Sequence, residues 1–208
     1  MKIIKPGYKI LQYPEIEDLK WLEAIGRIPY KSEGRITEDS YKGFLTKLIA
    51  AGHEAMIEFL DITVMFQVDR GVSHELVRHR LCSFAQESTR YCNYTTDKFG
   101  GEVTFIDNTH LYKDPSSYMI WMNSLTVAER AYKALIENGE SPQIARGVLP
   151  NSLKTEIVMK ANLREWRNIF KLRTPVTAHP QMREVMIPLL KELQSLVPIV
   201  FDDLEVQT

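Results

Sequence analysis

A change of hydrophobic period at residues 57–68 is the feature that most constrains the fold of this chain. Residues 57–68 alternate apolar and polar side chains, which predicts a half-buried β-strand. Apolar residues recur at helical spacing in four other segments, 15–26, 37–51, 117–138 and 181–196. Strands and helices mix without a regular βαβ alternation, so we expect an α+β fold. The prediction is one domain over residues 1–208, with a mixed, largely antiparallel sheet packed against helices.

Weaker patterns predict two further strands and a long loop. Residues 1–13 alternate loosely and are expected to form an edge strand, and residues 155–161 alternate again. Residues 92–116 are rich in polar side chains, with a short strand expected at 102–106. Such a segment is typical of a partly mobile surface loop that covers a ligand.

Capping residues predict where several helices begin. Thr37 is a suitable N-cap, and so is Asn162, which is followed three residues later by a glutamate. Ser141-Pro142 is typical of the start of a short helix. Asp69-Arg70-Gly71 is expected to form a turn, and a helix is expected to follow it from residue 72 to about residue 81.

The charges and cysteines exclude some classes of protein. The 26 basic and 27 acidic residues nearly cancel, which argues against a protein that coats nucleic acid. Two cysteines do not make a disulfide framework, so we expect a cytoplasmic protein. The chain contains no apolar run of membrane-spanning length, so no membrane association is expected.

The densest chemistry lies between residues 78 and 91. Arg78, His79, Arg80 and Arg90 are interleaved there with serine and threonine hydroxyls, a set that suits a phosphorylated ligand. The alternative is a solvated basic helix end, which the helix dipole favours. If a helix ran through this stretch, Arg78 and Arg80 would point to nearly opposite sides and could not hold one phosphate.

The sequence resembles the flavin-dependent thymidylate synthase family. Arg78-His79-Arg80, seven further residues and Ser88 match the signature of that family without a gap, and Thr89-Arg90-Tyr91 follows it. Further blocks in the order of the family are Gly52-His53-Glu54, Glu58, Ala145-Arg146-Gly147-Val148-Leu149-Pro150, Asn162-Leu163-Arg164, Asn168, Leu172-Arg173 and Ala178-His179-Pro180-Gln181. Together they span residues 50 to 182.

The resemblance implies a reaction and the residues that serve it. Members methylate dUMP to dTMP with carbon from methylenetetrahydrofolate and a hydride from FAD, which NADPH usually reduces. It implies FAD binding by His53, Ala55, Arg78, His79, Arg80, Gln86, Asn162, Leu163, Arg164 and Asn168. It implies dUMP binding by Glu75, Leu76, Val77, Arg78, Gln86, Glu87, Ser88, Thr89, Arg90, Arg146 and Arg173. It also implies a homotetramer whose sites combine residues of different subunits.

Arg173 is the catalytic residue that the resemblance implies, placed at the N3/O2 edge of the uracil. A fixed cation beside an acidic N–H favours the deprotonated form and lowers the pKa of that group. It also stabilises negative charge that develops on the ring. The alternative role of Arg173 is that of a cation closing the helix over 163–172.

Other candidate sites are less well supported. Ser88 has neither a neighbouring base nor a nucleophile-elbow sequence, so it is expected to bind ligand. Cys82 and Cys92 are expected to be bystanders, His74 an ordinary residue of a helix surface, and no HxxxH or HExxH motif predicts a metal site.

Two departures from the family and two rival functions remain open. Ala55 stands where many relatives carry a hydroxyl, and Glu75 where a glutamine is frequent, so a carboxylate there would repel a phosphate unless it is paired. The rivals are another FAD- and nucleotide-binding reductase, and a non-enzymatic module that binds nucleotides or RNA through residues 78–90.

Overall fold

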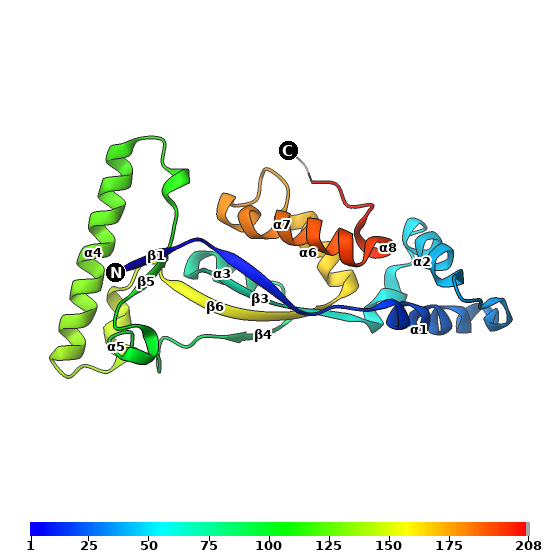
Figure 1. Ribbon diagram of the computed structural model, residues 1–208, viewed down its shortest axis with the longest axis horizontal. Coiled ribbons are helices and arrows are strands. Elements are labelled where there is room, and N and C mark those ends of the chain that lie inside the picture. Colours follow the sequence, from blue (N-terminus) through cyan, green and yellow to red (C-terminus); the bar gives the residue numbers. More distant parts are fainter. Residues whose placement is uncertain (207–208) are drawn as a thin grey trace. The chain divides into compact units, whose positions relative to one another are not determined.

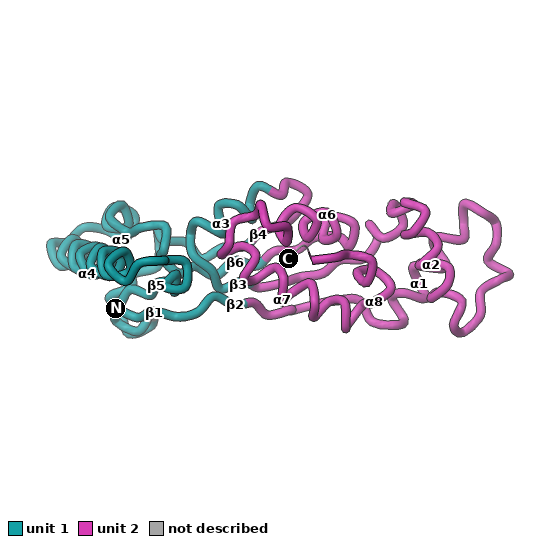
Figure 2. Tube along the Cα trace, turned by 90° about the horizontal axis from the view of Figure 1, so that it is seen from above, with its two compact units in different colours: residues 1–7, 66–78, 85–158 teal, residues 8–65, 79–84, 159–208 magenta. Residues whose placement is uncertain are grey.

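The computed structural model describes residues 1–206, and for residue 99 the backbone alone. Its residues cluster into two compact units, shown in Figure 2. Unit 1 contains residues 1–7, 66–78 and 85–158, and unit 2 contains residues 8–65, 79–84 and 159–208. Two long strands, β3 (Asp61–Asp69) and β6 (Lys154–Asn162), continue from one unit into the other.

The strands form two sheets (Figure 1). The four-stranded sheet has the order β2-β3-β6-β4, in which β2 is Gly7–Gln12 and β4 is Ser83–Gln86. The second sheet pairs β1 (Lys2–Ile4) in parallel with β5 (Thr104–Ile106). The N-terminal segment therefore forms two strands rather than one, and β2 is at a sheet edge as expected.

Helices account for most of the remaining described chain. They are α1 (Ile16–Arg27), α2 (Ser40–Ala50), α3 (Arg70–Leu76), α4 (Pro115–Glu137), α5 (Pro142–Ala145), α6 (Leu163–Arg173), α7 (Pro180–Leu196) and α8 (Pro198–Phe201). Short 3-10 helices cover Ile28–Tyr30, Glu33–Arg35, Glu54–Phe59, Asp97–Phe99, Thr109–Leu111 and Arg146–Val148. The prediction of an α+β fold with mixed sheets and packed helices is confirmed. No described helix is long and apolar enough to cross a membrane.

Strand β3 confirms the alternation that predicted it. Ile62, Val64, Phe66 and Val68 are all fully buried, while the residues between them are partly exposed. The prediction was wrong for residues 57–60, because Glu54–Phe59 forms a 3-10 helix before the strand begins.

Helix α3 is the clearest correction to the sequence analysis. The expected turn at Asp69 is an N-cap, since the Asp69 carboxylate accepts a hydrogen bond of 2.7 Å from the Val72 backbone N–H. The helix ends at Leu76 and not near residue 81. Arg78, His79 and Arg80 therefore follow the helix, and the expectation based on helical geometry for the two arginines does not apply.

Two other helix starts give opposite results. Helix α2 begins at Ser40 rather than after Thr37, and the Ser40 hydroxyl accepts a hydrogen bond from the Thr37 backbone N–H. Asn162 is a true N-cap, whose side-chain oxygen accepts a hydrogen bond of 2.8 Å from the Glu165 backbone N–H. Helix α6 therefore begins directly at the end of β6, with no linker.

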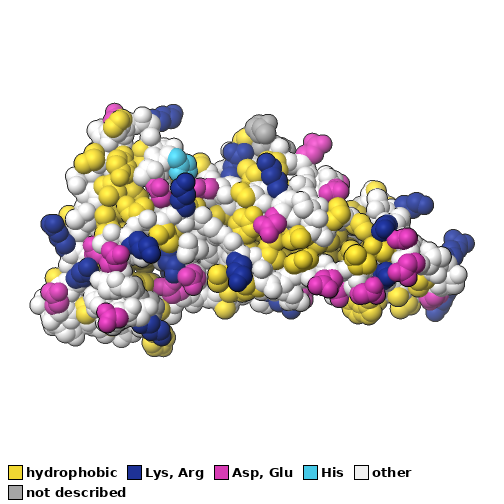
Figure 3. Space-filling model, viewed as in Figure 1, with side chains coloured by type: hydrophobic (Ala, Val, Ile, Leu, Met, Phe, Trp, Pro, Cys, Tyr) yellow, Lys and Arg dark blue, Asp and Glu magenta, His cyan; other side chains and the backbone are white. Residues whose placement is uncertain are grey.

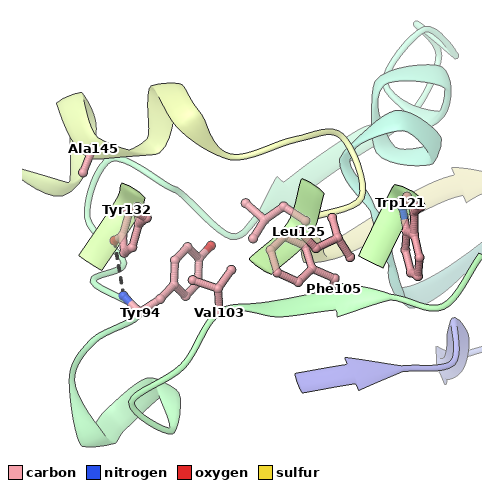
Figure 4. Packing of buried hydrophobic residues seen from close by; sticks show 8 residues of the cluster. Tyr94, Val103, Phe105, Trp121, Leu125, Tyr132 and Ala145 are labelled. Atoms are coloured by element: carbon pink, nitrogen blue, oxygen red, sulfur yellow. Dashed lines mark hydrogen bonds between the residues drawn. The ribbon is translucent and has the colours of Figure 1, made fainter. Parts of the chain in front are cut away.

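Unit 1 has its own core between α4 and the segment before it. Tyr94, Val103 and Phe105 pack with Trp121 and Tyr132 of α4, and the Tyr132 hydroxyl accepts a hydrogen bond from the Tyr94 backbone N–H (Figure 4). The segment 92–116 was expected to be a partly mobile surface loop. Most of it is exposed or half-buried, while Tyr94, Val103 and Phe105 anchor it in the core.

Unit 2 is built around α6 and α7. Trp166 and Phe170 of α6 are buried, and the indole N–H of Trp166 donates to the carbonyl of Ile62 in β3. The buried Arg167 guanidinium makes a two-pronged ion pair with Asp203, at 2.6 Å for each prong. These contacts fix the position of α6 within its unit, and α6 carries several of the predicted site residues.

Candidate functional site

The predicted site residues divide between the two units. Unit 1 contains Glu75, Leu76, Val77, Arg78, Gln86, Glu87, Ser88, Thr89, Arg90 and Arg146. Unit 2 contains His53, Ala55, His79, Arg80, Asn162, Leu163, Arg164, Asn168 and Arg173. The residues implied for dUMP thus belong almost entirely to unit 1, and most of those implied for FAD belong to unit 2.

A cationic cavity of about 240 Å³ lies in unit 1. Arg146 and Thr89 line it, and the Arg146 guanidinium donates a hydrogen bond of 2.9 Å to the Thr89 hydroxyl. Arg70 and His74 also line it, and the sequence analysis missed both. Their spacing of four residues puts them on one side of α3, which is the signal that could have revealed them. His74 lies exposed on the surface of α3, as expected, and it faces this cavity.

Hydrogen bonds fix strand β4 and the turn after it, which contributes Thr89 to this cavity. The Gln86 amide of β4 donates to the Ser73 hydroxyl at 2.9 Å and to the Thr155 hydroxyl at 3.2 Å. The Glu87 carboxylate accepts from the Tyr94 hydroxyl at 2.7 Å and from the Lys154 ammonium at 3.0 Å. Burial, and then the Glu87 charge, raise the pKa of Tyr94, so its hydroxyl stays a donor.

Ser88 lies in a tight turn after β4. Its hydroxyl oxygen accepts from the Arg90 backbone N–H at 3.4 Å, and its carbonyl accepts from the N–H groups of Tyr91 and Cys92. Thr89 is buried, whereas Arg90 is exposed. This arrangement presents hydroxyl and backbone groups from one turn, which suits the binding of an anion more than nucleophilic catalysis.

A larger cavity of about 480 Å³ lies in unit 2. The predicted residues Asn162, Arg164 and Asn168 line it, together with Glu54, Glu58, Leu81, Glu165 and Lys171. Arg164 forms an ion pair of 2.6 Å with Glu58, and Lys171 lies 3.9 Å from Glu54. The cations of this cavity are therefore matched by carboxylates, and its side-chain amides and the exposed Leu81 offer neutral contacts.

His79 and Arg173 meet beside this cavity. The Arg173 Nε–H donates a hydrogen bond of 3.0 Å to His79 Nε2, although the two residues are 94 positions apart. His79 Nδ1 lies 3.5 Å from the Glu165 carboxylate. Burial and the Arg173 cation lower the pKa of His79, and Glu165 opposes that shift only in part. Both effects favour the neutral form of the His79 imidazole.

The remaining predicted residues fall into buried and exposed groups. The side chains of Leu76 and Leu163 are fully buried, so they can reach a ligand only through their backbone. His53 and Ala55 are exposed at the start of the 3-10 helix Glu54–Phe59, and Val77, Arg78 and Arg80 are exposed after α3.

Both cysteines are free thiols. Burial raises the pKa of Cys82 to about 12 and also raises that of Cys92, which keeps both protonated and poorly nucleophilic. Among the described residues, no group of three or more His, Cys, Asp or Glu is arranged to hold a metal ion.

The comparison with known families settles the family of the chain. The model of the thymidylate synthase complementing protein family matches residues 9–199, which include both cavities. The chain belongs to this family. The resemblance inferred from the sequence is confirmed.

Named relatives in the family are described as flavin-dependent thymidylate synthases. One from Pyrococcus furiosus is 32% identical over 86% of this chain and 74% of its own length. One from Corynebacterium glutamicum is 30% identical over 81% of this chain and 72% of its own length. Among solved structures, a UMP/dUMP methylase PolB from Streptomyces cacaoi, bound with 5-Br dUMP, superposes with a TM-score of 0.79. It covers 97% of this chain at 20% identity, so that likeness shows the shared fold.

Proposed function

We propose that this family member is a flavin-dependent thymidylate synthase, which methylates dUMP to dTMP for nucleotide biosynthesis. Methylenetetrahydrofolate donates the carbon and NADPH is the reductant. The observation that carries the proposal is the family match over residues 9–199, together with relatives of that name at about 30% identity.

The residues of the unit 2 cavity fit part of a flavin dinucleotide. The amides of Asn162 and Asn168 suit the polar edge of the flavin ring, and Leu81 offers an apolar surface for its plane. Arg78 and Arg80, both exposed, suit the diphosphate. FAD supplies, when bound, the hydride that reduces the transferred carbon to a methyl group. The remaining FAD contacts proposed are those of His53, Ala55, His79, Gln86, Leu163 and Arg164.

The unit 1 cavity fits the phosphate of a nucleoside monophosphate. Arg146 donates from a fixed position, because Thr89 already holds its guanidinium. Arg70 and His74 add donors that the family resemblance did not imply. Ser88 and Arg90 supply a hydroxyl and a further cation from the turn after β4. Glu75, Leu76, Val77, Arg78, Gln86 and Glu87 complete the proposed dUMP contacts.

Arg173 is the proposed activating residue, at the N3/O2 edge of the uracil ring. Its guanidinium has a defined orientation because His79 accepts from its Nε–H. A cation held there lowers the pKa of the uracil N3–H and stabilises the negative charge that makes C5 nucleophilic.

The active enzyme is proposed to be a cytoplasmic homotetramer that combines residues of different subunits in each site. Met119, Ile120 and Val127 expose 54%, 70% and 65% of their surface on α4, an apolar face of the kind that a subunit contact covers. On the face drawn in Figure 3, lysines and arginines are interspersed with acidic residues, unlike the one-sided basic patch of an RNA-binding module.

Two measurements test the function. Purified protein should be yellow, or become so with FAD, and should release tritium from C5-labelled dUMP when methylenetetrahydrofolate and NADPH are present. Bound flavin without tritium release would instead indicate another FAD-dependent reductase. A colourless protein whose RNA binding falls steeply with salt would indicate the non-enzymatic module.

A further inference from the structure

We propose that Glu165 is a positioning residue for the proposed reaction, which orients Arg173 through His79. The inference rests on the proposed function of Arg173 and concerns a side chain that neither the family resemblance nor the relatives assign. The three residues, called here the Glu165–His79–Arg173 triad, all lie in unit 2.

The first step concerns the protonation of His79. An arginine is always protonated and its Nε–H can only donate, so the His79 Nε2 that accepts from it must carry a lone pair. With Nε2 accepting, the proton of the imidazole is on Nδ1, and the lowered pKa of His79 agrees with this single protonation. That nitrogen is the one that faces Glu165, at 3.5 Å from Oε1.

The second step concerns what holds this tautomer. The 3.5 Å separation is long for a hydrogen bond, so the interaction is mainly electrostatic, between an N–H dipole and a carboxylate. Only 6% of the His79 side chain and 8% of the Glu165 side chain are exposed, so water screens the interaction weakly. A carboxylate on the Nδ1 side favours the Nδ1–H tautomer, which leaves Nε2 free to accept from Arg173.

The third step concerns Glu165 itself, which the fold holds firmly. It lies in the first turn of α6, where the helix dipole favours a negative charge, and its backbone N–H is bound by the Asn162 cap. The Asn168 amide lies 3.4 and 3.3 Å from its two oxygens. Glu165 and Arg173 are eight residues apart, about 12 Å along the helix axis, so the imidazole connects two groups that do not meet directly.

The consequence is that the Arg173 guanidinium is oriented before a substrate binds. With its Nε–H committed to His79, Arg173 cannot rotate freely about its last bonds, and it loses less entropy when it meets a substrate. Without the Glu165 charge, His79 can place its proton on Nε2, where it would repel the Arg173 donor. Glu165 therefore acts on Arg173 without touching the substrate.

Glu165→Gln tests this role with little disturbance of the fold. Glutamine keeps the volume and can still serve at this position after an N-cap, so α6 should begin as before. Glu33→Gln, at an exposed position of unit 2 that lines neither cavity, is the matched control for loss of one charge. We expect Glu165→Gln, assayed with saturating FAD because Glu165 also lines the unit 2 cavity, to lower kcat for dUMP methylation about tenfold, with the KM for dUMP changed less than about threefold.

A double-mutant cycle separates positioning from a general structural effect. Arg173→Lys has no Nε–H for His79 to accept, so Glu165→Gln in that background should lower the residual kcat less than about twofold. If the two losses multiply instead, Glu165 does not act through Arg173 and the proposal is overturned. An unchanged kcat in the single variant would overturn it equally.

The nitrogen-15 NMR spectrum of the imidazole reads the tautomer directly in the wild-type holoenzyme, with His79→Gln used to assign the signal. We expect the proton on Nδ1, and a mixture of tautomers in Glu165→Gln. A wild-type His79 protonated on Nε2 would refute the triad, whether or not Glu165→Gln folds. Wild-type tritium release tests the proposed function separately, so a failure of one does not look like a failure of the other.

Discussion

The two cavities differ in how their cations are paired. In unit 1, the cations that line the cavity are Arg70 and Arg146, and no Asp or Glu is among its described lining residues. In unit 2, Arg164 and Lys171 face Glu54, Glu58 and Glu165. Unpaired cations favour a compact anion such as a phosphate monoester, whereas a balanced set favours a ligand held by polar edges and a flat apolar surface. On this ground we propose the phosphate of dUMP for the unit 1 cavity and the flavin for the unit 2 cavity.

The most severe test of this division is Arg173→Ala in unit 2. We expect kcat for methylation to fall at least about 100-fold, because a preorganised cation at the site of developing charge is lost. FAD absorbance should persist, since the amides and apolar surface of the cavity are untouched. A fully active variant would refute the activating role, and Lys191→Ala on α7 is the control for loss of a cation from unit 2.

Arg146→Ala tests the unit 1 cavity. A charge-assisted hydrogen bond contributes about 1.5–3 kcal/mol, so the affinity for dUMP should fall roughly 10- to 100-fold while FAD binding stays constant. Calorimetric titration of dUMP measures the change, and Lys113→Ala, at an exposed position of unit 1 outside the cavity lining, is the control for loss of a cation. Loss of FAD with retained dUMP affinity would reverse the assignment of the two cavities.

Ser88→Ala should have a smaller effect. One neutral hydrogen bond is worth about 1 kcal/mol, so dUMP affinity should fall about fivefold with kcat nearly unchanged. Ser195→Ala, which removes an exposed hydroxyl on α7, is the control. If chemistry were abolished while dUMP still bound normally, Ser88 would have to be considered a nucleophile again.

The pH dependence of stability gives the smallest expected effect. The pKa of His79 is lower in the folded than in the unfolded state, so below about pH 6.5 the unfolded chain binds more protons. The free energy of unfolding is therefore unaffected by His79 above that pH, and it decreases as the pH falls from the unfolded-state pKa towards the lower folded-state pKa. Between pH 7 and 5, denaturant unfolding should show that the free energy of unfolding depends less steeply on pH in His79→Gln than in wild type.

Local signals were sufficient for much of the fold. The alternation in β3 and the Asn162 cap were predicted correctly, because each depends on side chains within a few residues. Helix α3 was predicted too long, because residues 77–99 contain no glycine or proline that would mark its end. The helix ends just before His79, which is buried against Glu165 of α6. Because Glu165 is more than 80 residues away, a local sequence pattern cannot reveal this contact.

Contacts between residues distant in sequence also explain why strand β4 and several residues of the cavities were not predicted. Ser83–Gln86 has little β propensity of its own and is a strand because it lies beside β6 in the sheet. Arg70, His74 and Glu165 lie outside the blocks that carried the family resemblance, and only the folded chain brings them to the cavities. Arg146 and Arg173 were predicted because the family blocks include them.

The absence of a linker between β6 and α6 has a consequence for insertions and deletions. One extra residue after Asn162 would turn the whole of α6 by about 100° and advance it by about 1.5 Å. Glu165, Asn168 and Arg173 would then leave their positions together, although no side chain had been replaced. An insertion or deletion at this junction should therefore be tolerated no better than a substitution in either cavity.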